Sequence, residues 1–149
     1  LRKGNREDWS KNKKDLAKIY LASVLSKNWD VVGLEYDNLL TRSDGKLMVI
    51  DPGGSFHFRA QGGFKPYDEE PAELHTLMDP NRQSQSARVF GVLDKDLIRS
   101  TAYNYLPRFK RSTVHKMFAR SGFDDDMSKQ FTDTFMKRRN NILKQLAEL

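Results

Sequence analysis

The hydrophobic pattern at the start of the chain changes from helical to irregular near residue 27. Over residues 11–26 apolar side chains recur every three to four positions, which predicts a helix, and Ser10 is expected to cap it. Residues 27–37 lose this period and contain Gly33, so they are expected to form a loop. The apolar positions of the helix are Leu16, Ile19, Tyr20, Ala22 and Val24.

Two short apolar runs follow the loop. Residues 39–41 and 47–50 are joined through Ser43-Asp44-Gly45, and Asp-Gly between such runs predicts a β-hairpin. The hairpin as a whole is expected over residues 39–51. Asn38 then precedes one strand and Asp51 follows its partner. Because these two ends lie side by side in an antiparallel pair, Asn38 and Asp51 are predicted to be neighbours in space.

The second half of the chain is expected to be helical. Residues 52–70 form a long irregular segment, and a segment of this kind in a compact domain is typically functional or mobile. Asp94 and Ser112 are expected to cap two of the helices that follow. The pattern therefore predicts a mainly α-helical single domain over residues 1–149 with a small β-hairpin. Its predicted helical remainder, residues 71–149, contains helices at 71–78, 84–91, 94–106, 112–120 and 125–146, with Phe118, Phe123, Phe131 and Phe135 in the core.

Composition excludes several classes of protein. Of the 149 residues 38% are hydrophobic and 31% are charged, which is typical of a globular domain rather than a disordered chain. There is no cysteine, which rules out disulfides and thiolate metal sites. No apolar run approaches the roughly 18 residues of a transmembrane helix. Because the sequence begins with Leu1 rather than Met, we expect it to be part of a longer protein.

The net charge of +6 is unevenly distributed. Residues 1–29 contain eight basic and three acidic side chains, and residues 108–149 contain ten and five. Residues 30–107 contain eight basic and twelve acidic side chains. The acidic middle would attract a divalent cation. The basic ends, including Lys137-Arg138-Arg139, either form solvated helix faces or contact an anionic ligand such as phospholipid, inositol phosphate or nucleic acid.

The candidate chemistry is concentrated in the acidic middle. Asp30 lies in the predicted loop, while Asn38 and Asp51 flank the predicted hairpin. Phosphoryl transfer requires a carboxylate that orients the attacking hydroxyl, and an amide and a second carboxylate that hold Mg²⁺ on the nucleotide phosphates. These three residues have the side chains and the order that such a site needs.

The same residues carry a family resemblance. Asp37-Asn38-Leu39-Leu40 resembles the Asn-Ile-Leu motif, and Ile50-Asp51-Pro52-Gly53-Gly54 resembles the Asp-Phe-Gly or Asp-Asn-Gly motif, of the protein kinase-like superfamily. The similarity is to its atypical branch, which includes phosphatidylinositol kinases, HipA-type kinases and bacterial effector kinases. The longer stretch from Asn28 to Gly62 is similar to kinase-like segments of bacterial effectors and toxins. The 13-residue separation of Asn38 and Asp51 is also close to that of protein kinases.

The resemblance implies a kinase-like C-terminal lobe with a role for each residue. Residues 27–38 would be the catalytic loop, with Asp30 as the catalytic carboxylate. Asn38 and Asp51 would bind Mg²⁺ and ATP, in a turn at residues 51–54 where Gly53 and Gly54 allow the backbone to bend sharply. Arg59 and Lys65 occupy the position of an activation or substrate segment and would bind substrate phosphate or carboxylate. The acceptor would be a hydroxyl of a protein or of a lipid or inositol head group.

Two departures from the family pattern leave alternatives open. The eight residues from Asp30 to Asn38 exceed the usual loop by about three, so Asp37 or Glu35 is an alternative catalytic carboxylate. No glycine-rich strand pair or Lys-bearing strand of an N-terminal lobe is recognisable, so that lobe is expected on a further segment or another chain. Rival functions are a catalytically inactive kinase-like scaffold and a basic helical nucleic-acid-binding domain. The expected location is the cytoplasm, or a host cytoplasm reached by a secreted bacterial effector.

Overall fold

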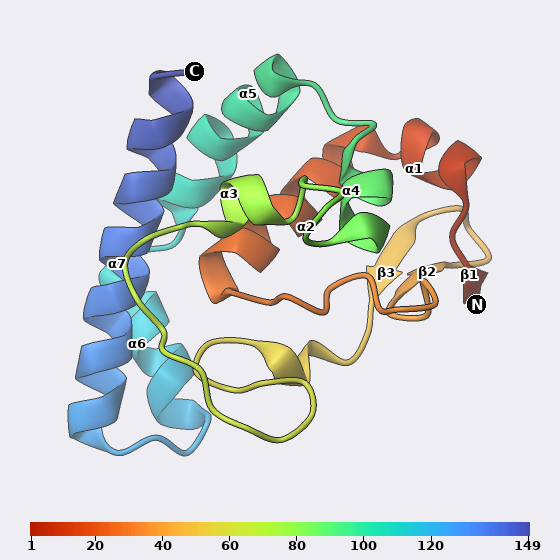
Figure 1. Cartoon of the computed structure of the whole chain (residues 1–149). Coiled ribbons are helices and arrows are strands. Elements are labelled where there is room, and N and C mark those ends of the chain that lie inside the picture. Colours follow the sequence, from red (N-terminus) through yellow and green to blue (C-terminus); the bar gives the residue numbers. More distant parts are fainter.

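The computed structural model describes residues 1–149, in which α-helices surround a central helix and a small sheet lies at one side (Figure 1). The central helix is α2 (Lys13–Ser26), and it contacts α5, α7, α3 and α4. The remaining elements are β1 (Arg2–Lys3), α1 (Arg6–Lys11), β2 (Leu39–Thr41), β3 (Leu47–Val49), the 3₁₀ turn η1 (Pro52–Gly54), α3 (Glu73–Thr76), α4 (Ser84–Phe90), α5 (Lys95–Tyr105), the 3₁₀ turn η2 (Leu106–Arg108), α6 (Arg111–Arg120) and α7 (Asp125–Ala147).

The predicted N-terminal helix is present, but a second helix precedes it. Asn5 accepts a hydrogen bond from the backbone of Asp8, and the Asp8 carboxylate accepts one from the backbone of Asn5, so this capping box starts α1. The expectation that Ser10 caps the helix is therefore wrong, because Ser10 lies inside α1. The capping box places a helix start five residues earlier than the apolar pattern alone indicated.

The predicted hairpin is confirmed, and a third strand extends it. β2 and β3 pair antiparallel with Leu39 opposite Val49, and β1 pairs with the other edge of β2. The strand β1 has only two residues, both exposed, so no apolar alternation marks it in the sequence. The chain is thus mainly helical with a small three-stranded antiparallel sheet rather than a two-stranded hairpin.

The C-terminal half is helical as predicted, with differences at the helix ends. Asp94 caps α5 by accepting a hydrogen bond from Leu97 N at 2.8 Å, as expected. Ser112 is not a cap, because α6 begins one residue earlier and has no side-chain cap. The helix predicted at 71–78 is shorter in the structure, where only the single turn α3 is helical.

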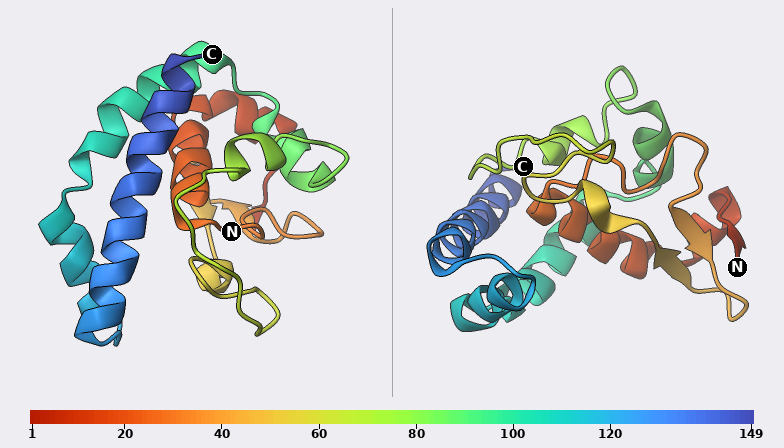
Figure 2. Two further views of the ribbon diagram at one scale, coloured as in Figure 1. Left: turned by 60° about the vertical axis from the view of Figure 1, so that its left-hand side comes forward. Right: turned by 90° about the horizontal axis from the view of Figure 1, so that it is seen from below.

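The hydrophobic core lies where α2 packs against the C-terminal helices, and α7 runs beside both α5 and α6 (Figure 2). Phe118, Phe131 and Phe135 are buried as predicted, while Phe123 is only partly buried. None of the helices combines the length and the apolar character that crossing a membrane requires. The core fixes the C-terminal end of α2, from which the candidate site continues.

Candidate functional site

The loop that carries Asp30 is anchored to the end of α2. Lys27 ends the helix in the left-handed conformation, and Asn28 N donates to Ser23 O at 2.9 Å. The side chain of Asn28 then accepts a hydrogen bond from Asp30 N at 3.1 Å. Since Asn28 is buried, this contact fixes the backbone of Asp30 relative to the core.

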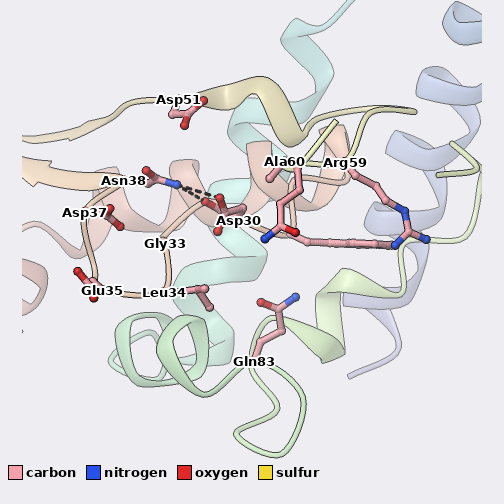
Figure 3. A pocket seen from close by; sticks show the side chains of 12 residues that line it. Asp30, Gly33, Leu34, Glu35, Asp37, Asn38, Asp51, Arg59, Ala60 and Gln83 are labelled. Carbon is pink, nitrogen blue, oxygen red and sulfur yellow. Dashed lines mark hydrogen bonds between the residues drawn. The ribbon is translucent and has the colours of Figure 1, made fainter. Parts of the chain in front are cut away.

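Asn38 joins the end of this loop to Asp30. Its amide Nδ2 donates to the Asp30 carbonyl at 2.8 Å and to the Asp30 carboxylate at 3.2 Å (Figure 3). Because Asn38 is buried and its nitrogen is used in this way, its Oδ1 oxygen is left as an acceptor for another group. The eight-residue loop is therefore closed at its base by a single side chain.

Asp51 lies across from Asn38, as the hairpin predicted (Figure 3). Ile50 N donates to Asn38 O at 2.9 Å, which ties the segment entering Asp51 to the start of β2. Asp51 itself has a left-handed backbone, with φ 55° and ψ 63°, and its carboxylate makes no hydrogen bond or ion pair. Asp adopts this conformation more readily than most non-glycine residues, and Lys27, Tyr36 and Phe56 of this chain also have positive φ.

These side chains line one open cavity of about 610 Å³ (Figure 3). Four carboxylates and a single guanidinium, that of Arg59, face it, so its field is negative. The acids are Asp30, Asp51 and the two alternatives for the catalytic carboxylate, Asp37 and Glu35. The cavity therefore brings the predicted trio together and keeps both alternatives within reach.

The environment of Asp30 raises the pKa of its carboxyl group. Burial raises the pKa of its carboxyl above the ordinary value of 3.8, the hydrogen bond from Asn38 opposes this, and the charges of Asp37 and Asp51 raise it further. A carboxylate whose proton affinity is increased in this way is a better acceptor for a hydroxyl proton than an ordinary aspartate.

Gly33 allows the loop to fold back on itself. Its φ is +85°, and a Cβ there would lie 2.3 Å from Asp37 Oδ1 and 3.2 Å from Asn38 N. Only glycine fits this position without displacing neighbours. The sequence marked Gly33 as a loop residue but gave no sign of this close approach.

The two glycines after Asp51 lie beside the cavity rather than in its wall. Gly54 is buried, and a Cβ on it would lie 3.3 Å from Ala60, so the turn packs closely on the segment that follows. Gly53 is exposed, and a Cβ there would lie 3.5 Å from the Asp51 carboxylate. Their position agrees with a role in the turn and not with direct contact to a ligand in the cavity.

Arg59 and Lys65 have different surroundings. Arg59 lines the cavity, with its guanidinium 5.7 Å from the centre of the Trp29 ring. Lys65 does not line the cavity: it is 3% exposed, lies 4.6 Å from the same ring and donates its ammonium to Gly54 O. Burial lowers the pKa of Lys65 to about 8. The Arg59 side chain thus lines the cavity, whereas Lys65 is buried beneath the Gly53-Gly54 turn and holds it by a hydrogen bond.

A buried ionic network behind Trp29 was missed from the sequence. Trp29 Nε1 donates to Glu73 at 2.8 Å, and Arg138 pairs with the other oxygen of Glu73. The side chains of Arg138 and Glu73 are 0% and 4% exposed, so Arg138 is neither a solvated residue nor a surface ligand for anions. The signal was present in the spacing, because Arg138 continues the buried stripe of Phe131, Phe135 and Ile142 on α7.

The donor set suits a loosely held Mg²⁺ better than a structural metal. No group of three or more His, Cys, Asp or Glu side chains gathers in a way that could hold a metal ion. Asn38 Oδ1 and the Asp51 carboxylate would offer two oxygen ligands, and Mg²⁺ is commonly bound by one or two protein oxygens together with water and substrate phosphates. The residues present therefore fit an ion that arrives with a nucleotide.

No protein family, curated protein or solved structure matches the chain. Its function is therefore inferred from its own residues and their geometry.

Proposed function

We propose that this chain is the C-terminal lobe of a kinase-like phosphotransferase that uses Mg²⁺ and ATP. Asn38 and Asp51 would hold Mg²⁺ against the nucleotide phosphates, and Asp30 would face the hydroxyl of the acceptor. The acceptor oxygen forms a bond to the γ-phosphorus while the bond from that phosphorus to the β–γ bridging oxygen breaks. The hydroxyl proton passes to Asp30 and ADP leaves.

The observation that carries the proposal is the position of the Asn38 amide. Its nitrogen donates to Asp30 and its side-chain oxygen makes no hydrogen bond, while the bond from Ile50 N to Asn38 O holds the segment of Asp51 beside it (Figure 3). One side chain therefore links the group that would accept a proton to the group that would bind the metal. Such coupling is expected of a site where the attacking hydroxyl and the phosphate must be aligned.

The charge of the cavity favours binding of ATP together with a divalent cation. Four carboxylates would repel the phosphates of free ATP, whereas a bound divalent cation would offset most of this negative charge. We therefore expect ATP to bind with Mg²⁺ and poorly without it. The base and ribose would be held by an N-terminal lobe supplied by another segment or a partner chain.

Calorimetric titration of the chain with the non-hydrolysable analogue AMP-PNP tests the metal site. Wild type is expected to bind the analogue in Mg²⁺ and at least roughly tenfold more weakly in EDTA, and Asp51→Asn is expected to lose the Mg²⁺-dependent part. Asp44→Asn is the matched control, because Asp44 lies at the exposed tip of the same hairpin and outside the cavity.

Transfer of the γ-phosphate tests the chemistry. With radiolabelled ATP, and with the chain joined to its N-terminal lobe, label is expected on a protein or inositol-lipid hydroxyl when the wild type is present. The Asp30→Asn variant is expected to transfer no label while retaining nucleotide binding. If Asp51→Asn binds Mg²⁺ and AMP-PNP as the wild type does, the metal assignment is wrong. Full transfer by Asp30→Asn would instead move the catalytic role to Asp37 or Glu35.

A further inference from the structure

A second cavity, of about 460 Å³, lies between α2 and α5, which run next to one another in the domain (Figure 2). Lys14 and Lys18 project into it from the first half of α2, one helical turn apart, and Arg108 closes it from η2. The loop of Asp30 follows the last residue of α2, so this cavity and the candidate active site lie toward opposite ends of that helix.

The charged side chains that line this cavity are all positive. Three cationic side chains line it and no acidic side chain does. None of the three makes an ion pair or a hydrogen bond, whereas many other cations of the chain pair with a carboxylate. Because like charges repel when unpaired, gathering three of them without a counter-charge costs stability and is typical of an anion-binding surface.

Polar groups that are free to bind a ligand complete the cavity. Thr101, Asn104 and Tyr105 present hydroxyl and amide groups from α5, and none of these side chains takes part in a hydrogen bond. Ser100 donates its hydroxyl to Leu97 O at 3.2 Å and keeps its acceptor capacity. The cavity thus combines cations for phosphate groups with neutral groups for hydroxyls.

Tertiary packing assembles this surface from the two basic ends of the chain. Lys14 and Lys18 belong to the basic N-terminal stretch and Arg108 begins the basic C-terminal stretch. The acids nearest to them in sequence do not line the cavity, and Asp96 on α5 pairs instead with Arg99 at 3.6 Å. The two separate clusters of positive charge therefore become one site only in the folded chain.

We propose that this basic cavity binds a small polyphosphorylated ligand, an inositol polyphosphate either free in solution or as the head group of a membrane lipid. Three cations within one cavity match two or more phosphates, and its volume lies in the range of small-ligand sites. A nucleic acid fits less well, because the aromatic ring at the cavity, Tyr105, is half-buried and packs edge-on against Phe109 instead of offering a face for stacking.

Titration with inositol 1,4,5-trisphosphate tests the proposal in solution, and vesicles of phosphatidylcholine containing phosphatidylinositol 4,5-bisphosphate present the same head group on a membrane. The double variant Lys18→Gln/Arg108→Gln is expected to bind either probe roughly a hundredfold more weakly, since each charge-assisted contact contributes about a factor of ten. Lys129→Gln/Lys144→Gln is the matched control, because it removes the same charge from exposed positions of α7 outside the cavity.

The outcomes separate the possibilities. Loss of binding in the cavity variant with retention in the control supports the proposal, and the probe that binds more tightly identifies a free or a membrane-bound source. Absence of binding to both probes, or equal loss in the two double variants, overturns it. Tighter binding of a single-stranded RNA oligonucleotide than of either probe, lost in the cavity variant, would also overturn it in favour of a nucleic-acid site.

Discussion

Replacing Arg138 by methionine should destabilise the domain strongly, because this residue connects α7 to the segment that supports Trp29. Arg138 donates to Val24 O at 2.8 Å and to Glu70 O at 2.7 Å in addition to its ion pair with Glu73. The substitution keeps the apolar volume of the stem but leaves the Glu73 carboxylate buried without its partner. Breaking a buried pair in this way costs about 3–5 kcal/mol, a large share of the roughly 5–15 kcal/mol of a typical domain.

Urea unfolding followed by tryptophan fluorescence and circular dichroism measures this loss. Lys137→Met is the control, because Lys137 is an exposed neighbour whose ion pair spans 3.8 Å, and it should change the unfolding free energy by less than about 0.5 kcal/mol. In Arg138→Met/Glu73→Met no unpaired charge remains, so the double variant should cost at least about 1 kcal/mol less than the sum of the single variants. A loss below 1 kcal/mol for Arg138→Met, or strict additivity, would refute this account of the network.

Three further predictions concern the loops of the candidate site. Gly33→Ala should lower the unfolding free energy by about 1 kcal/mol more than Gly45→Ala in the same urea assay, because both have positive φ but a Cβ meets a neighbour only at Gly33. Asp30→Asn should be more stable than wild type at pH 7 and lose this advantage near pH 3. The pKa of Asp30 is raised in the folded state, so the stability of wild type relative to the variant falls as pH rises above about 3.8. Unfolding midpoints that stay parallel over this range would contradict it. Lys65 binds its proton less tightly in the folded state, where its pKa is about 8. Wild type should therefore gain unfolding free energy relative to Lys65→Met between about pH 8 and 10.5, and a difference that stays constant over this range would contradict the burial of the Lys65 ammonium.

The sequence predicted what depends on local pattern. The helical period of residues 11–26, the Asp-Gly hairpin and the cap at Asp94 all act over a few residues, and the structure confirms them. The adjacency of Asn38 and Asp51 also followed, since a tight hairpin brings its two ends together whatever packs around it. Thus the geometry of the proposed metal-binding pair was accessible before any tertiary structure was known.

Long-range packing decided the rest. Arg138 was expected among solvated or ligand-binding basic residues, but its partner Glu73 lies 65 positions away and only the docking of α7 buries the pair. Lys65 was predicted to bind substrate, but in the folded chain its ammonium is buried and donates to Gly54 O. The basic cavity between α2 and α5 likewise joins charges from the two ends of the chain. The spacing along α7 could have indicated that Arg138 is buried, but local sequence does not identify the partner of a charged side chain. That partner is determined by the packing of the whole fold.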